Sequence, residues 1–350
     1  MNIRKIVSIC LLLSLTLLLP GCGHKEGEHI TAGFAAAEAS DYPTALSCFE
    51  EAIVAGEDLE LAYRGQGIAY LGLADYDAAL ASFEKALDNA GIFAGDLERD
   101  INFYMATAYA KKNENAKAIE LLQAIADSDD ENADAYYLLG SLYIREGDYN
   151  NSIYNYEKAM ACADNPQAMK IEVYKELSAN GKEDKGREYL NQLLSDGKDL
   201  SDYQQGELYY YLGNYDEART HLELARQSDD KNKSQIIYLL GATYEALGDM
   251  NYASVVYQGY LENHPDDVLV MNQYGVCKLE AGNASEAIQI FEDALNKQDT
   301  SMTQTLRFNQ IVGYEKTGDF AKAKELMEAY MAAYPDDAEA AREATFLETR

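Results

Sequence analysis

The sequence predicts an all-α fold, an α-solenoid of about nine helix–turn–helix units with a C-terminal capping helix. Two stretches, GQGIAYLGLADYDAALASFEKAL from Gly65 and LLGATYEALGDMNYASVVYQGYL from Leu239, show the repeated pattern. Each has a small residue, a long or aromatic residue three positions later, a polar turn, then another small residue followed by an apolar one. This pattern recurs with a period near 34 residues, and a period of that length indicates a solenoid. Acidic pairs such as Asp266-Asp267 fall between the units and mark the linkers.

The start of the second helix in each unit can be placed by the residue that follows the turn. These starts are Tyr42, Tyr76, Asn115, Tyr149, Glu183, Tyr215, Met250, Ala284 and Phe320. Glycine recurs in the first helix, where it costs up to about 1 kcal/mol relative to alanine, so a packing reason is expected. These glycines are Gly33, Gly67, Gly140, Gly206, Gly241 and Gly275. The expected partners on the second helix are Phe49, Phe83, Leu122, Tyr156, Leu190, Leu222, Tyr257, Phe291 and Met327.

The helix ends are predicted from glycines and acids. C-terminal caps of the first helices are expected at Gly147, Gly181, Gly213, Gly248, Gly282 and Gly318. The acids of the linkers are expected to cap the helices that follow them. Two units depart from the pattern: the third has Ala106 and Asn115, and the fifth has Tyr174 and Gly186 where the others have a small residue and alanine.

A 34-residue period with these recurring features resembles the tetratricopeptide (TPR) repeat, and the resemblance covers nearly all of the chain after Lys25. It implies a solenoid over residues 29–335 and a capping helix over residues 336–350. In TPR families the first helices of successive units line a concave groove that holds an extended peptide or a partner's helix. The resemblance therefore implies a scaffold that binds a protein or peptide partner.

The N-terminus has the pattern of an export signal. Arg4 and Lys5 precede an apolar run over residues 6–19 that is too short to span a membrane. Leu19-Pro20-Gly21-Cys22 resembles the lipobox of bacterial lipoproteins, which implies a signal peptide over residues 1–21, lipidation of Cys22 and a lipidated tether over residues 22–28. An ordinary signal peptide with a chance cysteine remains the alternative. Either way we expect an extracytoplasmic protein, and with lipidation one anchored in the cell envelope.

The net charge of −31 disfavours nucleic acid and anionic lipid as partners. It favours a basic, neutral or cation-bridged partner, although it could equally serve solubility. Cys48, Cys162 and Cys277 are widely spaced, so they predict small helix residues rather than disulfides or redox chemistry.

The sequence nominates no catalytic residue, no cofactor and no metal site. His24 and His29 could hold a metal weakly, but a solvated tether explains them better. DSDDEN (Asp127 to Asn132) superficially suggests a calcium loop. It lacks the central glycine and distal glutamate of the EF-hand, so an inter-repeat capping loop is the better interpretation.

The candidate binding residues lie on the first helices. The position three residues before each small residue should face the groove, and five of its nine occupants are aromatic: Ile30, Arg64, Phe103, Tyr137, Ile171, Tyr203, Tyr238, Asn272 and Phe308. Phe34 and Tyr210 should lie on the same side. Packing between neighbouring units explains these residues equally well, and both interpretations stay open.

Two functions fit this sequence. The first is a non-catalytic, membrane-anchored scaffold for a protein or peptide. The alternative is an accessory factor in polysaccharide export or cell-wall assembly that contacts glycan, because tyrosine faces can stack on sugars. The carboxylate clamp of chaperone-binding TPR domains is not expected, since Arg64 and Lys175 lie several repeats apart and no asparagine follows the small positions.

Overall fold

The computed structural model describes residues 27–39, 41–91, 95–196, 200–228, 231–297, 299, 301–335 and 337–350. The predicted signal peptide, the predicted lipidation site Cys22 and most of the predicted tether lie outside these residues. The described residues form nineteen helices and no strand, as the all-α prediction requires. Among the described residues, no helix combines the length and apolar character needed to cross a membrane.

The helices alternate between first and second helices of nine units. The first helices are α1 (Glu28–Glu38), α3 (Leu59–Gly72), α5 (Gly95–Lys111), α7 (Ala133–Arg145), α9 (Pro166–Ala179), α11 (Asp202–Tyr211), α13 (Lys233–Ala246), α15 (Val268–Glu280) and α17 (Thr303–Thr317). The second helices are α2 (Tyr42–Ala55), α4 (Tyr76–Asn89), α6 (Asn115–Ser128), α8 (Tyr149–Cys162), α10 (Glu183–Asp196), α12 (Tyr215–Gln227), α14 (Met250–Leu261), α16 (Ala284–Leu295) and α18 (Phe320–Ala333), and α19 (Ala338–Glu348) follows. All nine predicted starts of second helices are confirmed.

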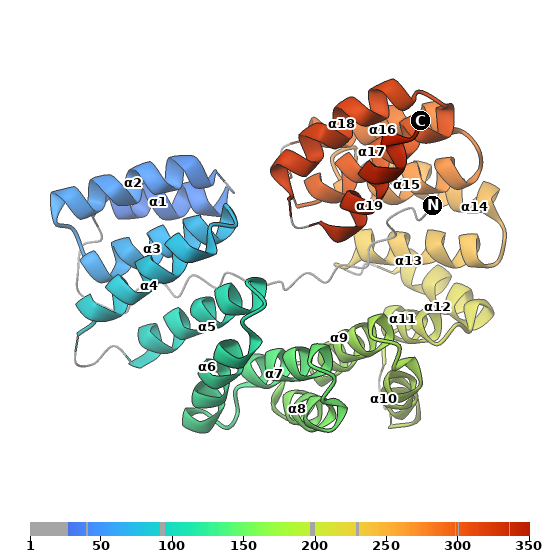
Figure 1. The fold of residues 1–350 in the computed structure, drawn as a ribbon. Helices are drawn as coiled ribbons and strands as arrows, with labels where there is room; N and C mark the ends of the chain where they lie inside the picture. Colours follow the sequence, from blue (N-terminus) through green and yellow to red (C-terminus); the bar gives the residue numbers. More distant parts are fainter. Residues whose placement is uncertain are drawn as a thin grey trace. The chain divides into compact units, whose positions relative to one another are not determined.

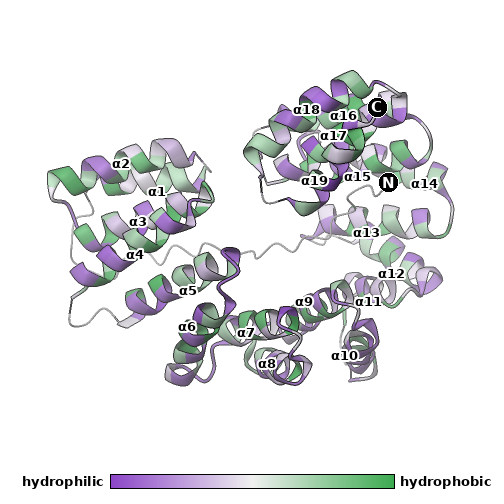
Figure 2. Ribbon diagram, viewed as in Figure 1, coloured by the Kyte–Doolittle hydropathy of each residue, from purple (hydrophilic) through white to green (hydrophobic). Residues whose placement is uncertain are grey.

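The chain divides into two compact units, with the boundary between Tyr189 and Leu190 inside α10. The N-terminal unit contains α1 to α9 and the first part of α10, and the C-terminal unit contains the rest of α10 through α19 (Figure 1). Each unit has its own apolar clusters, such as the one around Phe83 and the one around Tyr257. In Figure 2, hydrophobic and hydrophilic residues alternate along the helices, as expected where one face of a helix is buried.

The glycines of the first helices make room for large side chains of the second helices, most of them aromatic. A Cβ added to Gly67 would come within 2.5 Å of the Phe83 ring, and one added to Gly140 within 2.5 Å of the Tyr156 ring. Gly33, Gly206, Gly241 and Gly275 face Phe49, Leu222, Tyr257 and Phe291 in the same way. A packing reason for these glycines is therefore confirmed: the nearest atoms belong to a side chain of the second helix, and at Gly206 the backbone nitrogen of Leu222 is also close, at 3.1 Å.

The fifth unit builds the same contact with the sizes reversed. Tyr174 stands on α9 where the other units have a small residue, and Gly186 stands on α10 where they have alanine or, in the fourth unit, serine. A Cβ added to Gly186 would lie 2.9 Å from the Tyr174 ring and 3.0 Å from its Cα. The apparent irregularity of this unit is therefore a compensated exchange that preserves the helix–helix contact.

The first helices end as predicted. The six capping glycines all adopt positive φ, between 70° and 84°. In the second and third units the same place is taken by Ala74 and Asn113, at φ 58° and 60°. Asparagine tolerates this conformation better than alanine does, so Ala74 carries a small local strain.

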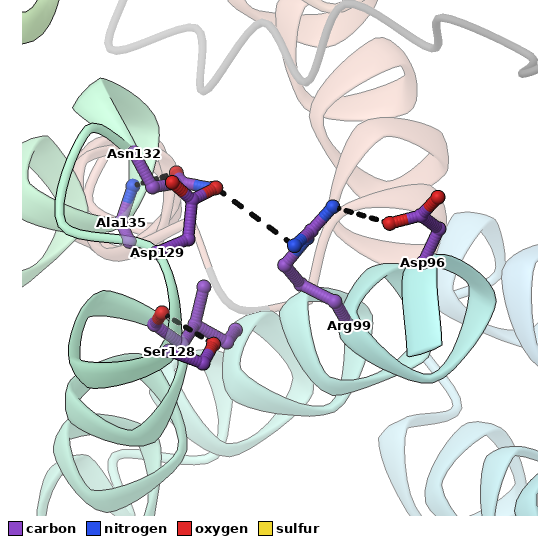
Figure 3. Close-up of polar contacts among 7 residues, drawn as sticks. Asp96, Arg99, Ser128, Asp129, Asn132 and Ala135 are labelled. Carbon is purple, nitrogen blue, oxygen red and sulfur yellow. Dashed lines mark hydrogen bonds and ion pairs between the residues drawn. The ribbon is translucent and has the colours of Figure 1, made fainter. Parts of the chain in front are cut away.

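The acids of the linkers cap the following helix in only some cases. Asp267 and Asp337 accept hydrogen bonds from the first turns of α15 and α19, as predicted. In the linker after α6, however, the cap is Asn132, whose side chain accepts from the Ala135 amide at 3.0 Å. The Asp129 carboxylate instead accepts from the side-chain Nδ2 of Asn132 and lies 3.8 Å from Arg99, which also binds Asp96 (Figure 3). DSDDEN is thus a capping loop held by α5.

Candidate functional site

The predicted groove residues of the N-terminal unit occupy two environments. Phe34, Phe103 and Tyr137 are half-buried and pack against the apolar clusters of this unit. Phe34 meets the Phe49 ring edge-on, with 5.0 Å between ring centroids. Their exposed parts remain accessible on the first helices, so partner contact at these three residues stays a prediction.

Arg64 is a packing residue. Its side chain is only 5% exposed, and its Nε donates to Asp100 at 2.6 Å. The guanidinium lies over both the Phe34 ring and the Tyr104 ring, with each ring centroid 5.6 Å from Cζ. Because Arg64 is buried and its charge is paired with Asp100, it cannot offer a charge to a partner's carboxylate. The groove assignment of Arg64 is corrected accordingly.

Two predicted groove residues of the C-terminal unit are also packing residues. Asn272 is fully buried, and its Oδ1 accepts from Asn309 on the next first helix at 3.0 Å. Phe308 is 1% exposed and packs against Tyr330. Ile30 and Ile171 are buried as well. For these positions the second interpretation, packing between neighbouring units, is the correct one.

Three tyrosines of the C-terminal unit form the candidate site, which we call the tyrosine face: Tyr203 and Tyr210 on α11 and Tyr238 on α13. All three are half-buried and pack against one apolar cluster, which also contains Tyr257. The Tyr210 ring is braced edge-on by Tyr215, at 5.9 Å between centroids. Such rings lose little entropy on binding and each keeps a polar hydroxyl, which suits contact with another macromolecule.

A buried carboxylate lies beside the tyrosine face. Glu245 on α13 is 7% exposed and accepts hydrogen bonds from the Tyr257 hydroxyl and the Gln273 amide, each at 3.0 Å. Burial and then the charge of Glu245 raise the pKa of Tyr238 to about 12, so its hydroxyl stays protonated. Glu245 was not among the residues predicted from the sequence. Glu245 lies four residues after Gly241 and therefore on the same face of α13, and this spacing could have predicted that Glu245 is buried.

The remaining candidate groups have local roles. His221 lies 2.9 Å from Asp202 and stacks on Tyr209, and His29 lies 3.1 Å from Glu51. Cys277 is buried, and burial followed by the charge of Glu245 raises the pKa of its thiol to about 12, so it stays protonated. Within the part of the chain that the structure describes, no three His, Cys, Asp or Glu side chains gather to hold a metal ion.

The comparison with solved structures found TPR proteins of low sequence identity. The C-terminal part of a TPR repeat-containing protein from Cytophaga hutchinsonii is 16% identical, with 89% of this chain and 98% of that chain covered and a TM-score of 0.37. A tetratricopeptide repeat protein from Parabacteroides merdae is 16% identical, with coverages of 82% and 97% and a TM-score of 0.41. YrrB, described as a TPR protein with an unusual peptide-binding site, is 20% identical, with coverages of 65% and 99% and a TM-score of 0.36.

The comparison with curated proteins found no relative of this chain. Two family models do match, and both are described as tetratricopeptide repeat. The first matches residues 31–92 and 104–168, and the second matches residues 201–230 and 235–267. The stretches matched by both models contain the repeat whose helices, glycines and caps are described above. Because the matched residues together make up more than half of its length, the chain belongs to the tetratricopeptide repeat family.

Proposed function

We propose that this protein is a scaffold, anchored by lipid at Cys22 to the extracytoplasmic side of a bacterial membrane, that binds a protein or peptide partner through its tyrosine face. TPR arrays are protein-interaction scaffolds, which supports the general role. The observation that carries the choice of site is the grouping of Tyr203, Tyr210 and Tyr238 on consecutive first helices, all half-buried against one cluster. Tyrosines of this kind are enriched among the residues that dominate binding energy.

The charge of the chain favours a basic partner. The net charge is −31, and Glu245 adds a buried carboxylate next to Tyr238. A lysine- or arginine-rich segment would be attracted over long range and could place its cations over the tyrosine rings. The export signal and the lipobox, which are sequence features, support the proposed location.

The test of the binding site is a pull-down from crosslinked cell envelopes with three versions of the protein. These are the wild type, a double variant Tyr203→Ala/Tyr238→Ala, and a control Tyr154→Ala, which removes a tyrosine that is 57% exposed on α8. We expect the wild type and the control to recover the same partner, and the double variant to lose it at least about tenfold. Circular dichroism verifies that the double variant keeps its helices. Equal recovery by all three would contradict the site, and specific binding to a glycan array would favour the alternative function.

The test of the anchor is the intact mass of the protein, wild type beside Cys22→Ala, combined with membrane fractionation. We expect an acylated mass and a membrane-bound wild type, with both lost in the variant. An unmodified, soluble wild type would remove the membrane from the proposal but leave the binding site untouched.

A further inference from the structure

Helix α19 is held in place by few buried side chains. Of its 11 residues only Ala340 and Leu347 are buried, whereas ten of the 13 residues of α15, which occupies the equivalent place 70 residues earlier, are buried. Both side chains join the apolar cluster that contains Met327 and Tyr330 of α18. The start of the helix is fixed by Asp337, which accepts from its first turn and from the Tyr330 hydroxyl. With so little buried apolar surface, α19 opens more easily than α15 does.

A buried carboxyl group of α17 faces the docked α19. Glu315 is 6% exposed, and neither of its carboxylate oxygens accepts a hydrogen bond from a donor among the described residues. Its polar neighbour is Glu343 on α19, which acts on it by charge and through a hydrogen bond between the two carboxyl groups. Such a bond forms only when one of the two is protonated, because a carboxylate has no hydrogen to donate. A proton on this pair therefore favours the docked position of α19.

No cation of the surrounding helices takes the place of that proton. Among the described residues, Glu343 is the charged group that acts on Glu315. Other charged residues of α15, α16, α18 and α19 bind elsewhere or are exposed: Lys278 with Glu286, Glu292 with Tyr314, Lys322 with Glu325, and Arg342. The pair of carboxyl groups is thus neutralised by protonation rather than by an ion pair.

The shared proton couples the docking of α19 to pH. Burial, followed by the charge of Glu343, raises the pKa of Glu315 to about 7, above the 4.5 of an unperturbed glutamate. When α19 moves away, the charge of Glu343 leaves with it and water reaches Glu315, so this pKa returns toward 4.5. The docked state therefore binds more protons between pH 4.5 and 7. Docking weakens as the pH rises through this range and stays weak above it.

We propose that α19 is a pH-controlled cap of the last repeat, docked while Glu315 and Glu343 share a proton and loosened when that proton is lost. Loosening opens the apolar cluster that Ala340 and Leu347 complete. The contacts among the preceding helices do not involve Glu343, so the change is a local opening and not an unfolding of the C-terminal unit. This proposal does not depend on what the tyrosine face binds.

The test is hydrogen exchange of the full chain in a non-ionic detergent, followed by mass spectrometry at pH 6 and pH 8. Protection factors, which remove the intrinsic effect of pH on the exchange rate, report how often α19 opens. We expect the protection of α19 to fall about tenfold from pH 6 to pH 8, the ratio given by pKa values of about 7 docked and 4.5 undocked. The protection of α13 to α15 should stay unchanged, because Glu245 there has hydrogen-bond donors.

Glu315→Gln removes the titrating group, so α19 should be equally protected at pH 6 and pH 8. The matched control is Glu348→Gln, which removes an exposed carboxyl group from α19 itself and should keep the tenfold change. Glu343→Gln should reduce the change, since an amide can donate to Glu315. Equal protection of α19 at both pH values in the wild type would overturn the proposal. So would a pH effect that persists in Glu315→Gln, or one that is just as large in α13 to α15.

Discussion

The seventh and ninth repeats place the same groups 70 residues apart, and one difference between them changes the chemistry of a buried acid. Glu245 and Glu315 occupy the same position in their first helices, and both are buried, at 7% and 6% exposed. Further along, Tyr260 donates to Asp267 at 2.9 Å, and Tyr330 donates to Asp337 at 2.6 Å. The two repeats therefore share a buried glutamate and a tyrosine–aspartate hydrogen bond at equivalent positions.

The difference lies in the groups that surround the two carboxylates. Glu245 accepts from Tyr257 and Gln273, but 70 residues later these positions hold Met327 and Glu343. Methionine donates no hydrogen bond, and an ionised glutamate repels. Neither carboxylate oxygen of Glu315 accepts a hydrogen bond from a donor among the described residues. Burial, followed by the charge of Glu343, raises the pKa of Glu315 to about 7.

This comparison teaches that a position in the repeat does not fix its chemistry. A buried acid is tolerated in the seventh repeat because the next two helices, α14 and α15, supply donors. In the ninth repeat the corresponding helices are α18 and the terminal helix α19, which supply none. The same glutamate is thus a structural acceptor in one place and a group that titrates near neutral pH in the other.

The largest expected effect comes from making the seventh repeat resemble the ninth. Gln273→Glu replaces a donor to Glu245 by a second buried carboxyl group, and Gln273 is only 2% exposed. We expect the free energy of unfolding at pH 8 to fall by about 2–4 kcal/mol, because a buried hydrogen bond to a charge is lost and a repulsion is added. Urea unfolding followed by circular dichroism measures the loss, and hydrogen exchange should place it in α13 to α15.

The pH dependence of Gln273→Glu provides its control. Two carboxyl groups that share a buried site bind a proton more tightly in the folded state than in the unfolded one, so the loss should shrink as the pH is lowered to 5. A variant as stable as the wild type at pH 8 would show that α15 can move away from α13, and that the donors of Glu245 do not set its environment.

A smaller effect is expected from removing the titrating acid. The pKa of Glu315 in the folded state, about 7, is above the 4.5 of an unperturbed glutamate. The folded state therefore binds more protons between these values, and this group lowers the stability as pH rises through that window. Glu315→Gln should raise the free energy of unfolding at pH 8 by an amount on the order of 1–3 kcal/mol and leave it nearly unchanged at pH 4.5.

Glu245→Gln is the matched control for Glu315→Gln, and it should act in the opposite direction. It weakens two hydrogen bonds to a carboxylate and should therefore destabilise the protein at pH 8. Stability measured from pH 4.5 to 8 distinguishes the two variants. If both variants gain stability at pH 8, the donors around Glu245 do not compensate its burial, and the contrast between the two repeats fails.

The positions of the helices and their caps were predictable from the sequence because the signals for them are local. Each second helix begins directly after a turn, and the capping glycines lie within a few residues of the ends that they close, so residue spacing alone located them. The exchange of Tyr174 and Gly186 was visible in the sequence, but its compensating geometry was not.

The candidate site was less predictable because its residues depend on contacts between repeats. Helical periodicity placed Arg64, Asn272 and Phe308 on the expected side of their helices, but it could not tell an exposed side chain from one covered by the next helix. The partner of Arg64, Asp100, is 36 residues away, and that of Asn272, Asn309, is 37 residues away. The contrast between Glu245 and Glu315 has the same origin, since their environments come from helices that follow them.

The smallest expected effect tests the part that the two repeats share. Tyr260→Phe and Tyr330→Phe each remove a hydroxyl that donates to the N-cap acid of the helix that follows, α15 or α19. We expect each variant to lose about 1 kcal/mol of unfolding free energy, as for other hydrogen bonds of this kind, with Tyr330→Phe slightly worse because its hydroxyl also accepts from Gln304 at 3.1 Å. Urea unfolding of both variants in parallel makes the measurement. If the losses are alike, the tyrosine–aspartate hydrogen bond stabilises both repeats equally. The different behaviour of Glu245 and Glu315 must then come from their neighbours. If Tyr330→Phe costs nothing, the last repeat is loosely packed as a whole, and that looseness rather than the missing donors would explain why Glu315 differs.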